Sequence, residues 1–168
     1  MTQTITGSIP QTARRTNPLA ALDRLHAPNL GLFALRAVLA VVFLFHGSQK
    51  LFGAFGGYGL DGTAQWMGSI GIPLPFVSAL LAALSETLGG VALLTGVAFR
   101  TTLIPLALTM LVAAFVGHAG KGFSAQAGGN EYALTLLVAI VALILTGPGT
   151  MGLGTLRGGN GRQGEHSA

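Results

Sequence analysis

Strongly polar side chains are scarce in this sequence, so the few that interrupt its apolar segments are the first candidates for chemistry. Arg36, His46, Gln49 and Lys50 all fall in the first apolar segment. If that segment crosses a membrane, each ionisable group costs about 2.5–3.5 kcal/mol on insertion scales and needs a partner or a function. Lys50 follows Arg36 by fourteen residues, and His46 and Lys50 are an i, i+4 pair. At about 100° per residue, these residues share one face of a helix.

Glu86 is the single charge in the second apolar segment. We compare depths by setting Lys50 level with Pro73 at the outer surface and allowing about 1.5 Å per residue. Glu86 then lies roughly 20 Å below that surface, Arg36 about 21 Å below it and His46 only about 6 Å below it. We therefore predict a buried ion pair between Arg36 and Glu86. A clamp between two helices is favoured, and a proton-relay or ligand role stays open.

A second polar group is predicted at the outer ends of the helices. It is formed by His46, Gln49, Lys50, His118, Lys121 and Glu131, with Asn130 and Tyr132 beside Glu131. These residues are candidates for binding an anion, a polar headgroup or a quinone carbonyl. The competing interpretations are snorkelling for Lys50, Lys121 and Glu131, and satisfied interhelical histidines for His46 and His118. Haem ligation by the two histidines is not favoured, because a macrocycle needs room between helices. No metal site is predicted, and no residue is assigned a catalytic role.

The elements that must position these residues are membrane helices. Of the 168 residues, 51% are hydrophobic and only 8% are charged, against roughly 25% charged in soluble domains. We predict four transmembrane spans at about 30–52, 73–99, 102–119 and 131–147, within a membrane domain of residues 30–149. Residues 1–29 are expected to form a polar tail with a short interfacial helix, and residues 150–168 a flexible tail. The fold class is an all-α, integral-membrane, up-down four-helix bundle.

Charge and cysteine content exclude several functions. The formal net charge is +4, but the cations are scattered at segment ends, so no nucleic acid partner is expected. The chain has no cysteine, which excludes disulfides, thiol redox chemistry and thiolate-bound iron–sulfur centres. Any electron transfer must therefore use a bound cofactor or that of a partner.

The distribution of cations predicts the orientation. Seven of the nine Lys and Arg residues fall on one side, and Lys50 and Lys121 fall on the other; the seven are Arg14, Arg15, Arg24, Arg36, Arg100, Arg157 and Arg162. Because cytoplasmic loops carry the excess of positive charge, both termini are expected in the cytoplasm. The Gly-rich segment from Gly53 to about Gly62 is then an outer loop. Helix packing should use the small residues of the second span: Ser78, Ala82, Ser85, Gly89 and Gly90.

Several short motifs follow one another in a fixed order along the chain: Phe45 to Gly53 (FHGSQKLFG), Glu86 before Gly89-Gly90, His118, Gly122-Phe123, Glu131-Tyr132 and Gly147-Pro148-Gly149. In this order they resemble the DoxX family of small bacterial membrane proteins. The resemblance covers about residues 36–152 and implies four helices in the bacterial plasma (inner) membrane. It also implies a link to thiosulfate:quinone oxidoreduction, or to assemblies that join sulfur metabolism to oxidative-stress defence. The matching positions are His46, Gln49, Lys50, Glu86, His118 and Glu131.

The leading hypothesis is a membrane subunit of a quinone-linked oxidoreductase, not an autonomous enzyme, with His46 and His118 bonded to a quinone headgroup. Lys50 and Gln49 would hold a carbonyl or an anionic substrate. The first alternative is a non-catalytic anchor or scaffold that recruits soluble redox enzymes to the bilayer. The second is a small proton-coupled transporter gated by Glu86 with Arg36, which would need a homo-oligomer to form a pathway.

Overall fold

The computed structural model describes residues 27–152, which contain helices and no strand. The long helices are α2 (Ala27–Phe52), α4 (Pro75–Thr95), α5 (Phe99–Val112) and α6 (Glu131–Thr146). A short helix, α3 (Gly59–Ser69), follows the 3-10 turn η1 (Ala54–Gly56), and a second 3-10 turn, η3 (Ala125–Ala127), precedes α6. The π-helical segment η2 (Ala113–Gly117) continues α5. The predicted tails lie outside the described residues, apart from 27–29 and 150–152.

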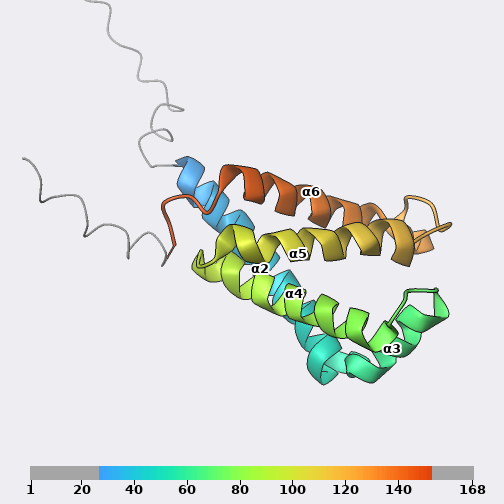
Figure 1. Cartoon of the computed structure of the whole chain (residues 1–168). Coiled ribbons are helices and arrows are strands. Elements are labelled where there is room, and N and C mark those ends of the chain that lie inside the picture. Colours follow the sequence, from blue (N-terminus) through green and yellow to red (C-terminus); the bar gives the residue numbers. More distant parts are fainter. Residues whose placement is uncertain (1–26, 153–168) are drawn as a thin grey trace, which may run out of the picture.

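The helices form an elongated bundle in which α4 is central. Helix α4 packs on α2, α3 and α5, and α5 packs on α6 (Figure 1). The core between them contains Phe43, Leu93, Leu103, Leu106 and Ile140. The small residues of α4 allow close approach, because a Cβ added at Gly90 would meet the Leu44 side chain and one added at Gly89 would meet Leu106.

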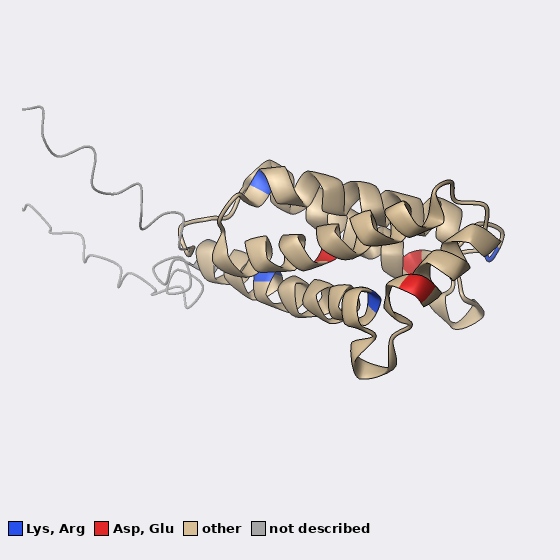
Figure 2. Ribbon diagram, turned by 60° about the horizontal axis from the view of Figure 1, so that its bottom comes forward, with Lys and Arg blue, Asp and Glu red and all other residues tan. Residues whose placement is uncertain are grey.

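The helices have the length and the apolar surface expected of an integral membrane protein. Three segments are long and apolar enough to cross a bilayer: Asn29–Phe52, Pro75–Thr95 and Phe99–Gly117. The fourth apolar helix, Glu131–Thr146, has 16 residues. Large apolar side chains such as Val41, Leu108 and Leu145 are exposed. The ribbon carries few charged residues along its length (Figure 2), so these helices can face lipid.

The helix boundaries differ from the predicted spans mainly around the second one. Helix α4 ends at Thr95 because Gly96 adopts a left-handed conformation (φ 77°) and its N–H caps the Ala92 carbonyl. Ala98 is also left-handed, and α5 starts directly after it at Phe99. The Gly-rich segment is not a simple loop, since Gly59 begins helix α3, whose Ala64 and Met67 pack against Ala79 and Ala82 of α4.

Candidate functional site

The register between α2 and α4 decides which buried charges meet. A Cβ added at Gly47 would collide with Thr87, and Gly90 lies against Leu44, so the two antiparallel helices are in contact at these levels. This register brings Lys50 beside Glu86, eleven residues into α4 from Pro75. The assumption that Lys50 lies level with Pro73 was wrong. The connection between α2 and α4 contains η1 and α3, and α3 packs against α4, so the end of α2 does not lie level with the start of α4.

The predicted ion pair between Arg36 and Glu86 is consequently wrong, and Lys50 is the partner of Glu86. The Lys50 Nζ atom donates to both carboxylate oxygens, at 3.0 Å to Oε1 and 2.7 Å to Oε2. The Glu86 side chain is only 3% exposed, whereas that of Lys50 is 25% exposed. Lys50 is thus already occupied by a carboxylate and is not an open cation for an anionic substrate.

Arg36 is buried and neutralised in a different way, by backbone carbonyls. Its Nε donates to the carbonyl of Leu93 at 2.8 Å, and its Nη1 donates to those of Met151 at 2.7 Å and Pro148. Its guanidinium also lies 5.3 Å from the ring centroid of Phe99. The last carbonyls of a helix lack partners within the helix, so Arg36 caps the end of α4 and ties it to the chain that follows α6.

His46 extends the polar cluster around Glu86 toward α6. Its Nδ1 lies 3.2 Å from Gln49 Oε1, and its ring is 6.3 Å from that of Tyr132 in an edge-on arrangement. His46 lies one helical turn before Lys50 on α2, which places it next to the ion pair of Lys50 and Glu86. Three elements therefore converge here, and we call His46, Gln49, Lys50, Glu86 and Tyr132 the Glu86 cluster.

His118 belongs to a separate place at the end of α5. Its Nδ1 lies 2.7 Å from the carbonyl of Ala113, at the start of the π-helical segment. A backbone carbonyl accepts only, so the proton is on Nδ1 and the Nε2 lone pair is available. π-Helical turns occur frequently at functional sites. Here the turn directs His118 into a pocket.

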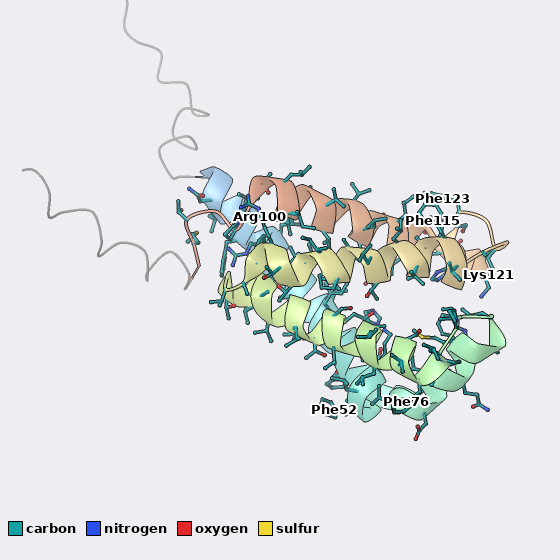
Figure 3. All side chains as sticks on the ribbon, in the orientation of Figure 1. Phe52, Phe76, Arg100, Phe115, Lys121 and Phe123 are labelled. Carbon is teal, nitrogen blue, oxygen red and sulfur yellow. The ribbon has the colours of Figure 1, made fainter. Side chains whose placement is uncertain are left out.

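This pocket, which we call the His118 pocket, has a volume of about 480 Å³ and is open to the surface, since Phe115 and Phe123 are both exposed. It is lined by Ala114, Phe115, His118, Ala119, Gly120, Gly122, Phe123 and Asn130. Figure 3 shows Phe115 and Phe123 together at one end of the bundle, near Lys121, and Arg100 at the opposite end. The lining is apolar and aromatic with one imidazole and one amide, which is the usual composition of a small-molecule site.

The predicted outer group is therefore divided. His46, Gln49 and Lys50 lie in the Glu86 cluster, while His118 lines the pocket, and no hydrogen bond links the two histidines within residues 27–152. Glu131 begins α6 next to Asn130, and its backbone N–H donates to the Phe123 carbonyl at 3.0 Å. The quinone-binding roles predicted for His46, Gln49, Lys50, His118 and Glu131 stay predictions.

The fold and these two sites define a small, all-helical membrane protein with polar side chains held inside an apolar bundle. The DoxX family model matches residues 31–119, more than half of the chain, and the protein belongs to the DoxX family. The match ends before α6.

Two curated relatives support this assignment. The chain is 33% identical over 118 residues to "Putative oxidoreductase CatD" of Bacillus subtilis (strain 168), covering 70% of this chain and 80% of that protein. It is 26% identical over 127 residues to "Inner membrane protein YphA" of Escherichia coli (strain K12), covering 73% of this chain and 86% of that protein. No solved structure gives a significant match.

Sequence reasoning missed the residues that shape the His118 pocket. Phe115 was not noted at all, Phe123 was noted only as part of the Gly122-Phe123 motif, and Asn130 was noted only as a neighbour of Glu131. The π-helical turn before His118 was not predicted, since an apolar stretch predicts a helix but not a local change in its hydrogen-bond pattern. Tyr132 was noted only for its position, since its contact with His46 depends on how α2 and α6 meet.

Proposed function

We propose that this protein is the membrane subunit of a quinone-linked oxidoreductase, with the quinone headgroup in the His118 pocket. The observation that carries the proposal is the fixed imidazole of His118 in an aromatic-lined cavity of a membrane protein. The name of the Bacillus subtilis relative supports an oxidoreductase, and that of the Escherichia coli relative supports the inner membrane. We assign the protein to the bacterial plasma membrane.

The residues of the pocket fit a quinone headgroup. The Nε2 lone pair of His118 can accept a hydrogen bond from a hydroxyl of the quinol, and the Asn130 amide can donate one to a carbonyl of the quinone. Phe115 and Phe123 offer ring faces to a flat headgroup, and the glycines leave room beside them. The isoprenoid tail would lie in the surrounding lipid.

The reaction needs an electron partner outside this chain. A quinone supplies two-electron chemistry, since its reduction to quinol consumes two electrons and two protons. The chain has no cysteine to bind an iron–sulfur centre. We therefore assign the electrons to a soluble redox enzyme that docks on the membrane subunit. Within the chain, His118 orients the headgroup and passes one of the two protons through Nε2, while the other proton comes from water at the open side of the pocket.

The same proposal includes four membrane spans with both termini in the cytoplasm. Helix α6, with 16 residues, extends about 24 Å, so it crosses only with local thinning of a hydrocarbon core about 30 Å thick. Thr150 N–H donates to Asn29 Oδ1 at 3.3 Å, so both ends of the described chain meet. Arg36 also contacts the chain at this end of the bundle, and Arg100 lies at the end opposite to Lys121 (Figure 3). Because positive charge is enriched on the cytoplasmic side, we assign the end with the two arginines to the cytoplasm.

The transporter alternative depended on a gate formed by Arg36 and Glu86. That pair does not form, because Arg36 is bonded to carbonyls and Glu86 to Lys50. The scaffold alternative is instead an outcome of the test below.

The test is retention of quinone by the full chain purified in mild detergent. Organic extracts of the wild type, His118→Gln and His46→Gln are analysed for quinone. We expect quinone in the wild type and in His46→Gln, and about ten-fold less in His118→Gln, since one hydrogen bond contributes roughly 1.4 kcal/mol. His46→Gln is the matched control, because it changes the same residue type at the other site. Absence of quinone from the wild type would leave the scaffold as the better account.

A further inference from the structure

The connection between α2 and α4, residues 53–74, is unusually poor in charge. Of its 22 residues, Asp61 alone is charged. A connection in water with the roughly 25% charged residues of soluble domains would have about five. The connection also has neither lysine nor arginine, so nothing in it selects anionic headgroups. This composition is that of a segment in contact with uncharged or zwitterionic lipid.

The largest side chains of this region face outward. Four residues are more than 70% exposed: Phe52 at the end of α2, and Phe55, Tyr58 and Leu74 in the connection. The ring of Phe55 stacks on that of Phe45, an exposed residue of α2, with centroids 5.1 Å apart. This stack joins the connection to the lipid-facing surface of α2. Exposed apolar surface of this extent marks an interaction site.

Two of these residues adopt a backbone conformation that glycine adopts more easily. Phe55 has φ 52° and Leu74 has φ 48°, in the left-handed region that L side chains rarely occupy. Glycine occupies two left-handed positions close to Phe55, Gly53 and Gly56. A glycine at 55 or 74 would remove the strain. The large apolar side chains at both positions therefore indicate a role outside the bundle.

The register between α2 and α4 sets the depth of the connection. The close approach of Gly47 to Thr87 fixes an antiparallel register in which Phe52 is level with Ala82. Ala82 lies seven residues, or about 10 Å, into α4 from Pro75. Figure 1 shows α2 ending well short of the start of α4. The connection thus covers about 10 Å of depth beside α4.

Helix α3 fills this difference in level. Its Ala64 and Met67 belong to one buried cluster with Ala79 of α4. A Cβ added at Gly68 would lie 3.3 Å from Cγ of Pro75, so the end of α3 is level with the start of α4. The turn η1, which follows α2, is then the deeper part. Helices that lie in a membrane interface insert by about 5–10 Å, which agrees with this range.

We propose that η1 and α3 form an anchor in the headgroup–acyl boundary of the lipid leaflet at this end of the bundle. Phe52 and Phe55 lie among the acyl chains, and Trp66, near the end of α3, lies closer to the headgroups. Tryptophan is enriched there because its ring is apolar and its N–H group can bind water. Asp61 is exposed in the first turn of α3, where the helix dipole favours its charge, and it faces the hydrated headgroups.

The test uses Trp66, the single tryptophan of the chain. The full chain is reconstituted in phosphatidylcholine vesicles whose acyl chains carry bromine, a short-range quencher of indole fluorescence, either near the headgroup or near the middle. Bromine near the headgroup should quench wild-type Trp66 most. In Trp66→Phe/Phe55→Trp, which keeps an aromatic ring beside Phe45, bromine near the middle should quench most. Trp66→Phe/Leu108→Trp is the control, since Leu108 is exposed on the lipid-facing surface of α5.

Iodide dissolved in the water distinguishes the opposite arrangement. A connection in water would let iodide quench wild-type Trp66 while brominated lipid would not, and this result would overturn the proposal without any variant. An indole at position 55 that is quenched by iodide, or that is shallower than Trp66, would also overturn it. The anchor does not depend on the proposed function, because these measurements need no quinone.

Discussion

The ion pair between Lys50 and Glu86 makes a quantitative prediction about the stability of the bundle. At 2.7 Å, two unit charges attract by about 6 kcal/mol with an effective dielectric constant of about 20. The cost of removing both charges from water offsets most of this attraction. The pair as a whole should therefore contribute little, while either charge left alone should be strongly destabilising.

The perturbation is a double-mutant cycle with Lys50→Met, Glu86→Met and the double variant. Lys50→Met should lower the free energy of unfolding by about 4 kcal/mol, because it leaves a carboxylate that is 97% buried without its cation. Glu86→Met should cost less, about 2 kcal/mol, since the partly exposed ammonium can turn toward water. The double variant should lie within about 1 kcal/mol of the wild type, because methionine fills the space without a charge.

The assay is reversible unfolding in mixed micelles, followed by circular dichroism at constant pH and ionic strength. Val41→Met is the control, since Val41 is exposed on the apolar surface of the same helix and its change should stay within about 0.5 kcal/mol. The reasoning would be refuted by a double variant as unstable as the sum of the two single variants. Such additivity would mean that the two side chains do not interact energetically.

Three further outcomes are expected. Arg36→Leu should lower the free energy of unfolding by about 3 kcal/mol in the same assay, because several carbonyls lose a charged donor; a change below about 1 kcal/mol would contradict this. Gly47→Ala should cost about 1–3 kcal/mol by collision with Thr87, whereas Gly31→Ala, with open space around it, should be neutral or slightly stabilising. Reporter fusions at the C-terminus should be active only in the cytoplasm, and an external C-terminus would reverse the proposed orientation.

The helices could be predicted from sequence because their signal is local. Long apolar stretches with few charges specify membrane helices by length and composition, and α6 begins at the predicted residue, Glu131. Helix α3 was missed because glycines surround it, and its stability comes from burying Ala64 and Met67 on α4, which is a tertiary effect.

The pairing of charges could not be predicted in the same way, because it depends on the register between two helices. The depth argument used the right rise per residue but an arbitrary common level. The true level is set by close contacts at Gly47 and Gly90. Gly90 was predicted as a packing residue, but the sequence does not show that its partner on α2 is Leu44. The difference between the assumed and the observed register of α2 and α4 explains why Lys50, and not Arg36, is the partner of Glu86.

The two cations of α2, the buried Arg36 and the partly exposed Lys50, are neutralised in different ways and so differ in their consequences. The planar guanidinium reaches carbonyls from two separate segments, a geometry that a single ammonium cannot reproduce. Those carbonyls cannot change their protonation state, so Arg36 stabilises one fixed arrangement of the helix ends. Lys50 instead binds a side-chain carboxylate that carries a full charge and is almost completely buried. Loss of Lys50 therefore leaves a buried charge without a partner, whereas loss of Arg36 leaves only carbonyl dipoles, so the Lys50 variant should be the less stable of the two.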